Sequence, residues 1–373
     1  MEELVLKVKY RSKILKIAFS KCLEFANNVI AYFGFGSGPK SFYKSSPPGL
    51  CEKKLLIIAP GILPVPPSGW GALETIIYES LSSYYEDGFE VWILNSRSCK
   101  EWRAARRETF DLVLCYYDVF AKRARSYFPN TPIINVCQYG FIGYPEKWHK
   151  SYHRVLKGLS LLDSICVMNK QQSEVLKKYL PNIDIFISSN GTSFNPIVGR
   201  NIEGPYLCLG KVEPRKSQFE LYNKFKNSDY SIVFVGNIVD TRVSNLIGED
   251  SSVSKVFIGE KTRVELAKDF HKYKALILLS QGEADALVLY EAQMAGLPVF
   301  VTKEGIGAQN LLLPWVNIIT DRTTPDDIEL VYKEINASPI EISSYASDNY
   351  SWKIKNAPLI LKINQMIDSR INP

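Results

Sequence analysis

The sequence predicts an α/β protein built from two doubly wound parallel sheets. From Lys54 onward, short apolar runs alternate with amphipathic stretches of about ten to twenty residues, the order expected of βαβα units. The predicted strands are apolar at nearly every position, which is typical of parallel strands buried on both faces. The series restarts after a polar stretch rich in Gly and Pro near 190–205, so the 373 residues form two cores rather than one.

Each predicted strand is an apolar run bounded by turn residues. In the first half the strands are 54–60, 89–95, 111–117, 132–138 and 164–169. In the second half they are 206–210, 231–236, 254–259, 275–280 and 297–302. Helical patterns separate them, such as 72–88, which Gly88 closes. Parallel sheets bind ligands at the carboxyl ends of their strands, so two facing halves predict one cleft between domains.

Residues 1–53 do not join this pattern. Lysines and arginines interleave there with apolar residues, so the segment is too charged for a transmembrane helix, and it lacks the cleavage site of a signal peptide. Two readings stay open. The segment is either a basic amphipathic helix that touches a membrane surface through residues 1–35, or a helical arm packed on the domain or on a partner chain.

The composition favours an anionic ligand over nucleic acid. Lys and Arg number 45 against 39 Asp and Glu, and the resulting net charge of +6 is spread along the chain. The seven cysteines include no C-x-x-C pair, which indicates a reducing compartment, and we expect a cytoplasmic protein. There are three histidines, two of them at His149 and His153, and we expect no metal site.

A glycine-containing loop, "PVPPSGWGALET" over 64–75, connects the first predicted strand to a helix. Gly69 and Gly71 allow the backbone to approach a ligand, and the helix N-terminus offers unpaired N–H groups to a phosphate. The motif is neither G-x-G-x-x-G nor a Walker loop, so a tight turn without a ligand is the alternative.

A basic loop, "LGKVEPRKSQ" over 209–218, follows the first strand of the second half. It brings Lys211, Arg215 and Lys216 to the carboxyl end of a buried strand, where the cleft is expected. Three cations in that position favour a diphosphate ligand. The alternative is a solvated loop.

Two glutamates stand out in "EADALVLYEAQMAGLPVFVT", from Glu283 to Thr302. We expect Glu283 in the loop after a strand, with Asp285 near the helix cap, and Glu291 within an apolar helix. They are too far apart to work as a close acid/base couple but can address two parts of one extended ligand. The alternative is two surface carboxylates, although an unpartnered charge at Glu291 would be costly among apolar neighbours.

These motifs resemble the retaining GT-B glycosyltransferases of family 4, also called group 1, from about Lys54 to the C-terminus. The most specific match is the E-x7-E signature with the following "AGLPV". "LGKVEPRK" is similar to the family's basic segment, "PPSGWGALE" to its glycine-rich loop, and "SSNGT" to its domain junction. "YSWKIKNAPLILKINQMI" resembles the closing helix.

The resemblance implies a GT-B fold of two Rossmann-like domains facing across a cleft. Its parts are a basic arm over 1–53, an acceptor-side domain over 54–200, a nucleotide-sugar-binding domain over 201–350, and a final helix over 351–373 that crosses back to the first domain. The implied activity is metal-independent, retaining transfer of a sugar from a UDP- or GDP-sugar to a hydroxyl of a glycan or lipid-linked glycan. No cofactor is implied.

The resemblance also implies roles for matching residues. Lys216 contacts the diphosphate with Lys211 beside it, Glu283 lies at the donor sugar, and Glu291 binds the ribose. The donor-binding set is completed by Gly69, Gly71, Arg215, Leu287 and Val288.

Three departures from the family pattern affect these roles. Lys211 stands where the family usually has arginine, which keeps the charge and loses bidentate geometry. Gln138, with Tyr139 next to it, takes the place of a histidine on the acceptor side. "ADAL" replaces the glycines that usually follow the first glutamate.

Two other functions remain as alternatives. A non-catalytic, sugar-nucleotide-binding GT-B protein is favoured by Gln138 and by the altered loop after Glu283. A dinucleotide-dependent oxidoreductase is disfavoured, because no G-x-G-x-x-G follows any predicted strand.

Overall fold

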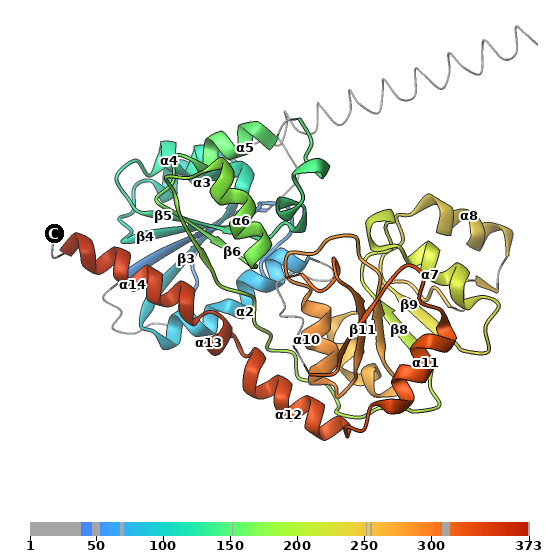
Figure 1. Cartoon of the computed structure of the whole chain (residues 1–373). Helices are drawn as coiled ribbons and strands as arrows, with labels where there is room; N and C mark the ends of the chain where they lie inside the picture. Colours follow the sequence, from blue (N-terminus) through green and yellow to red (C-terminus); the bar gives the residue numbers. More distant parts are fainter. Residues whose placement is uncertain are drawn as a thin grey trace, which may run out of the picture.

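The computed structural model describes residues 39–46, 53–67, 71–150, 152–250, 252–253, 256–307 and 314–371. Two α/β units lie next to each other, and the last helices of the chain run from the second unit back along the first (Figure 1). The predicted membrane contact through residues 1–35 lies outside the described residues, as does Gly69.

The first unit is a seven-stranded sheet in the order β1-β3-β2-β4-β5-β6-β7. All neighbouring strands are parallel except β1, which pairs antiparallel with β3. Its strands are β1 (Lys40–Lys44), β2 (Lys53–Ile58), β3 (Phe89–Ser96), β4 (Leu112–Cys115), β5 (Ile133–Cys137), β6 (Ser164–Val167) and β7 (Asp184–Ile187). Its helices are α2 (Ala72–Glu86), α3 (Cys99–Ala105), α4 (Ala121–Tyr127), α5 (Tyr152–Leu159) and α6 (Lys170–Tyr179), with short 3-10 turns η1 (Asp118–Phe120), η2 (Gly140–Gly143) and η3 (Pro145–Lys147).

The second unit is a five-stranded parallel sheet in the order β12-β11-β10-β8-β9. Its strands are β8 (Tyr206–Leu209), β9 (Ile232–Val235), β10 (Leu276–Leu278), β11 (Val299–Thr302) and β12 (Val316–Ile319). Its helices are α7 (Gln218–Phe225), α8 (Thr241–Glu249), α9 (Arg263–Asp269), α10 (Leu287–Met294), α11 (Pro325–Glu334) and α12 (Pro339–Tyr350), with turns η4 (Pro214–Lys216) and η6 (Phe270–Lys272). The chain then ends with α13 (Trp352–Lys355) and α14 (Ala357–Ile371).

The predicted α/β class with two parallel sheets is confirmed, and two local predictions are corrected. Residues 40–44, assigned to the arm, form the edge strand β1. Of the predicted strand over 254–259, the described residues 256–259 contain only an isolated bridge at Phe257, just after a turn in which the Val256 N–H is bonded to the carbonyl of Val253. Strands β7 and β12 were not predicted, since both lie at sheet edges and are only partly buried.

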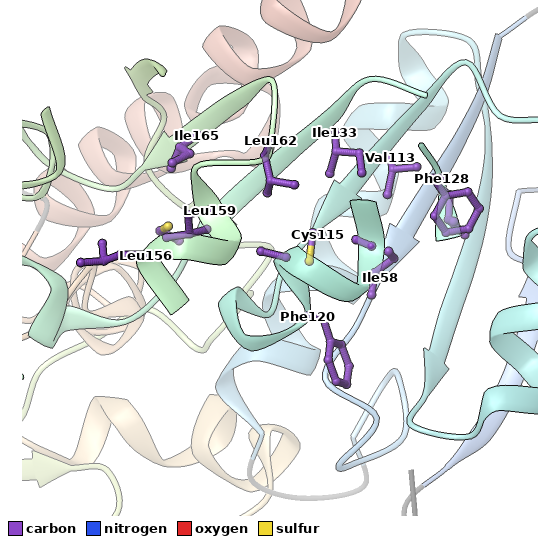
Figure 2. Packing of buried hydrophobic residues seen from close by; sticks show 14 of the residues in the cluster. Ile58, Val113, Cys115, Phe120, Phe128, Ile133, Leu156, Leu159, Leu162 and Ile165 are labelled. Carbon is purple, nitrogen blue, oxygen red and sulfur yellow. The ribbon is translucent and has the colours of Figure 1, made fainter. Parts of the chain in front are cut away.

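The first sheet is buried on both faces, as its uninterrupted apolar strands require. Figure 2 shows the layer on one face, which includes Ile58, Val113 and Ile133 of the strands together with Phe128 and Leu156. The opposite face packs against α2 and against α14, whose contributing side chains are Leu359, Ile363 and Ile367. The last helix of the chain is therefore part of the core of the first sheet.

Two chain segments cross between the units, one after β7 and one between α12 and α13. They are bonded to each other, because the Thr192 N–H donates to the carbonyl of Tyr350 at 2.8 Å. The second crossing is also fixed to the first sheet unit: Ser188 Oγ donates to the carbonyl of Lys355 at 3.0 Å, and Asn356 Nδ2 donates to Ser83 Oγ at 2.8 Å. These bonds set the relative position of the two sheets.

A buried polar cluster in the first unit joins Asp118, which follows β4, to Asn135 of β5. Asn135 Nδ2 donates to Asp118 Oδ1 at 2.7 Å, while Asp118 Oδ2, Asn135 Oδ1 and the hydroxyl of Tyr152 are buried without a hydrogen-bond partner. Burial raises the pKa of Asp118 to about 6, against the hydrogen bond from Asn135, which lowers it. The folded protein therefore retains a proton on Asp118 at pH values where the unfolded chain has lost it.

We predict that Asp118→Asn stabilises the protein at alkaline pH and has little effect near pH 4. The ordinary pKa of an aspartate is 3.8, and that of Asp118 in the folded protein is about 6. Stability is lost as the pH rises from the first value to the second, and the loss is constant above it. At pH 8 the free energy of unfolding should increase by up to about 3 kcal/mol, at 1.36 kcal/mol per pKa unit. Urea denaturation at both pH values checks this, with the exposed Asp348→Asn as control. An equal change at both pH values would contradict it.

Candidate active site

A cavity of about 620 Å³ lies between the two sheet units and is lined by residues of both. From the second unit it receives the segments after β8 and β9, the loop before α10 and the start of α10 itself. From the first unit it receives the start of α2 and the segment after β5. Strands of both sheets end at this cavity, which is where parallel sheets bind ligands, and its volume suits a small molecule.

The basic loop after β8 delivers its three cations to this cavity, and they are already paired with carboxylates. Arg215 and Lys216 each lie 3.1 Å from Glu283 Oε1. Glu213 forms ion pairs with Arg215 at 3.0 Å and with Lys211 at 3.6 Å. The Nζ of Lys216 lies over Gly210, whose φ of +136° favours glycine. Counted formally, the loop and Glu283 together carry one positive charge in excess.

Glu283 lies in the loop before α10, as predicted, and is nearly enclosed. Its Oε1 accepts a hydrogen bond from Ser280 Oγ at 2.6 Å in addition to the two ion pairs. Burial raises the pKa of Glu283, but Lys216, Arg215 and Ser280 together outweigh burial and hold it below its ordinary value. Glu283 is therefore a stable carboxylate rather than a proton donor.

Glu291 is buried within α10, as predicted, and faces the same cavity. Its partner is Arg263, whose guanidinium lies 2.5 Å from Glu291 Oε1. Burial raises the pKa of Glu291, Arg263 lowers it, and the nearby Glu79 raises it again. Arg263 therefore supplies the counter-charge that the apolar surroundings demand.

The start of α10 points its N-terminal end at the cavity. Its N-cap residue, Ala286, provides no side-chain acceptor for the first turn, where Leu287 and Val288 line the cavity. Asp285 is one residue before the cap, and it accepts instead from Asn190 N at 2.6 Å and from the Tyr290 hydroxyl at 2.9 Å. The helix thus presents unpaired N–H groups and the positive end of its dipole, which suits an anion.

The first unit contributes Gly71, Gln138 and Tyr139. Gly71 caps α2 with a φ of +149°, and an added Cβ would lie 2.9 Å from the side chain of Pro67. Gln138 and Asn190 exchange two hydrogen bonds between their amide groups, both at 2.9 Å. Gln138 is thus engaged by the domain junction, and burial raises the pKa of the neighbouring Tyr139.

The loop that contains Glu283 touches the first unit directly. A Cβ on Gly140 would lie 2.7 Å from the backbone of Glu283. Lys147 Nζ donates to the carbonyl of Gln281 at 2.7 Å, and Asn169 Nδ2 donates to the carbonyl of Ala284 at 3.0 Å. These contacts close the cleft on one side of the cavity.

The structure therefore brings together every predicted site residue that it describes, since Gly71, Gln138, Tyr139, Lys211, Arg215, Lys216, Glu283, Leu287, Val288 and Glu291 all line one cavity. Sequence reasoning missed Arg263 and Gly140. A glycine at Gly140 directly after a strand was a visible signal, whereas nothing local marked Arg263.

Comparison with protein-family models matches residues 203–341 to Glycosyl transferases group 1. The matched residues make up most of the second unit, which is therefore similar to a glycosyl transferases group 1 domain. Comparison with curated protein sequences finds no match.

Solved structures resemble most of the chain. A sucrose-phosphate synthase from Thermosynechococcus elongatus superimposes with a TM-score of 0.67 at 12% identity, covering 86% of this chain and 99% of that one. AviGT4, a glycosyltransferase involved in avilamycin A biosynthesis, gives 0.62 at 15% identity, covering 85% and 98%. Anabaena HepE in complex with UDP and glucose gives 0.58 at 14% identity, covering 86% and 99%. The chain therefore has the GT-B fold that its sequence predicts, and the match to the group 1 family lies in its second unit.

Among the described residues, no cluster of three or more His, Cys, Asp or Glu is arranged to hold a metal ion. Within the same ranges, no helix is long and apolar enough to cross a membrane.

We predict that Gly140→Ala opens the contact between the two units. Its Cβ would collide with the backbone of Glu283, which cannot move aside as a flexible side chain could. Hydrogen exchange of the 281–285 loop should become faster, and the thermal midpoint should fall by a few degrees. The control is Gly248→Ala in α8, where a Cβ meets nothing within 4 Å. Unchanged exchange in Gly140→Ala would show that the contact tolerates a methyl group.

Proposed function

We propose that this protein is a retaining glycosyltransferase that transfers a sugar from a UDP- or GDP-sugar to a hydroxyl of a glycan or lipid-linked glycan. One observation carries the proposal. The Lys216–Arg215–Glu283 cluster and the start of α10 meet in the cavity between the two units, and both belong to the unit that matches the group 1 family. The relatives of known structure include one in complex with UDP and glucose. UDP-sugars are therefore the first donors to test.

In this proposal the diphosphate lies against Lys216, Arg215 and the N–H groups of the first turn of α10. These groups offset the charge that builds on the departing diphosphate as the sugar takes on oxocarbenium character. Lys211 is nearby and half-exposed. Because Lys216 and Arg215 are held by Glu283 at 3.1 Å, they are preorganised for an anion. The acceptor hydroxyl attacks from the face that the diphosphate leaves.

The two carboxylates take separate parts of the donor. Glu283, kept ionised by its cations, accepts hydrogen bonds from the hydroxyls of the donor sugar. Glu291, deeper along α10, accepts from the ribose. The first unit, with Tyr139 and Phe141 lining the cavity, receives the acceptor. No metal ion and no protein nucleophile enters this scheme.

One observation favours a second function, sugar-nucleotide binding without transfer. Gln138 is bonded to Asn190 and has no ionisable group, so it cannot serve as the acid or base that a histidine would supply at this position. Donor binding without turnover on any acceptor would establish this alternative.

We predict that UDP or GDP raises the thermal midpoint of the protein and that Lys216→Ala abolishes this shift. A ligand at a hundred times its dissociation constant stabilises the fold by about 2.7 kcal/mol. Removing Lys216 takes away a cation with only 15% of its side chain exposed, so the diphosphate loses a strong interaction. Thermal-shift measurements against UDP, GDP and ADP check the result.

The matched control is Lys170→Ala, which removes an exposed lysine 3.8 Å from Glu174 in α6. This variant should respond to the nucleotide as the wild type does. The same midpoint shift in Lys216→Ala and wild type would remove the basic loop from the donor site.

We also predict that the transferred sugar keeps the anomeric configuration it had in the donor. Transfer through the leaving-group face requires this outcome, and proton NMR of the glycoside or of the hydrolysis product formed from a UDP-sugar reports it directly. Inversion would exclude the proposed trajectory while leaving the donor site intact.

A further inference from the structure

A single guanidinium in the wall of the cavity joins the two sheet units. Arg263 is the first residue of α9, after a capping box formed by Thr262 and Glu265. Its two terminal nitrogens take different partners: one lies 2.5 Å from Glu291 in α10, and the other lies 2.6 Å from Glu79 in α2. Glu291 belongs to the group 1 domain and Glu79 to the first unit. The pair of ion pairs therefore spans the cleft.

Glu79 is also bonded to both segments that cross between the units. Its second oxygen accepts from the Ser193 N–H at 3.0 Å and from Trp352 Nε1 at 3.1 Å. Ser193 lies on the first crossing and Trp352 on the second. The ring of Phe194, next to Ser193, lies 5.0 Å from the guanidinium of Arg263. Any change in how the two units are arranged must therefore act on Glu79 and Arg263.

The charges in this cluster make it sensitive to geometry. Two carboxylates with about a tenth of their side-chain surface exposed share one guanidinium. Glu79 has two further donors, whereas within the described part of the chain Glu291 is paired with Arg263 alone. A buried carboxylate that loses its partner is strongly destabilised, so the orientation of Glu291 depends on where Arg263 is held.

We propose that Arg263 is a positioning residue that links the nucleotide site to the arrangement of the two units. The proposal rests on the proposed function, in which Glu291 binds the ribose of the donor. Arg263 orients Glu291, and Glu79 fixes Arg263 to the interdomain crossings. Glu79 is not among the residues that line the cavity, so its influence on a bound nucleotide passes through Arg263. By reciprocity, nucleotide binding must bias the domain arrangement as much as the arrangement biases binding.

The test is Glu79→Gln, measured by calorimetric titration with UDP or GDP, whichever stabilises the wild type. The substitution removes the charge that holds Arg263 and places an amide opposite the N–H groups of Ser193 and Trp352. We expect nucleotide affinity to fall roughly tenfold, within the usual range for coupled sites. In Arg263→Lys, where the lysine can reach only one carboxylate at a time, nucleotide affinity should fall by a similar factor. Small-angle scattering should show a smaller compaction on nucleotide binding in both variants than in wild type.

The matched control is Glu86→Gln in the same helix, since Glu86 pairs at 3.6 Å with Lys353 on the second crossing but at the exposed surface. It should bind nucleotide as the wild type does. If Glu79→Gln is too unstable for titration, Glu79→Asp is measured for nucleotide affinity in its place. The aspartate keeps the charge, but its shorter side chain cannot hold Arg263 in the same position.

Wild-type affinity and compaction in Glu79→Gln would overturn the inference, even with Arg263→Lys impaired, because Arg263 would then act within the group 1 domain alone. That result does not contradict the proposed function, provided that Lys216→Ala no longer binds the nucleotide. Failure of the wild type to bind UDP, GDP or any sugar conjugate overturns both.

Discussion

The structure depends on the return of the chain's last helix to the first sheet. Leu359, Ile363 and Ile367 of α14 are buried against the strands of that sheet, so the end of the chain that leaves the second unit is anchored to the first. The Thr192–Tyr350 backbone bond ties this return path to the other crossing. Because both crossings are fixed at the same place, the two sheets can face each other across one cavity, and the site exists only through this constraint.

The electrostatic design of the cavity follows from its burial. Cations would be costly if left unpaired in a partly enclosed cavity, and here each has a carboxylate of the protein beside it. A bound diphosphate would share these cations with Glu283 rather than meet bare charges. The same logic applies deeper along α10, where Arg263 serves Glu291 and Glu79 together. The protein therefore balances these charges internally, and in the proposed function the binding of a diphosphate would be an exchange of partners.

The departure from the family pattern at Gln138 gains a physical meaning from the structure. The amide of Gln138 is bonded in both directions to Asn190, whose backbone N–H is bonded to Asp285. A residue at the end of β5 is thus connected to the loop before α10 through the domain junction. A neutral amide can form this reciprocal pair whatever the pH, which a histidine could not do. The position has a structural role here that is visible in the hydrogen bonds.

The sequence by itself determined the class of fold, most of the strands, and the segments that meet at the cavity. Apolar runs and turn residues are local signals, and they locate the carboxyl end of each strand. Lys216 and Glu283 both follow predicted strands, so the sequence alone could assign them to one cleft. Strand β1, the reduced strand at Phe257 and the Glu79–Arg263–Glu291 cluster were decided only by tertiary structure. Edge pairing and ion pairing between distant residues depend on where the chain brings its backbone and charges together in space. The need for a counter-charge at Glu291 was visible in the sequence, but no local pattern identified Arg263 as that counter-charge or Glu79 as its second partner.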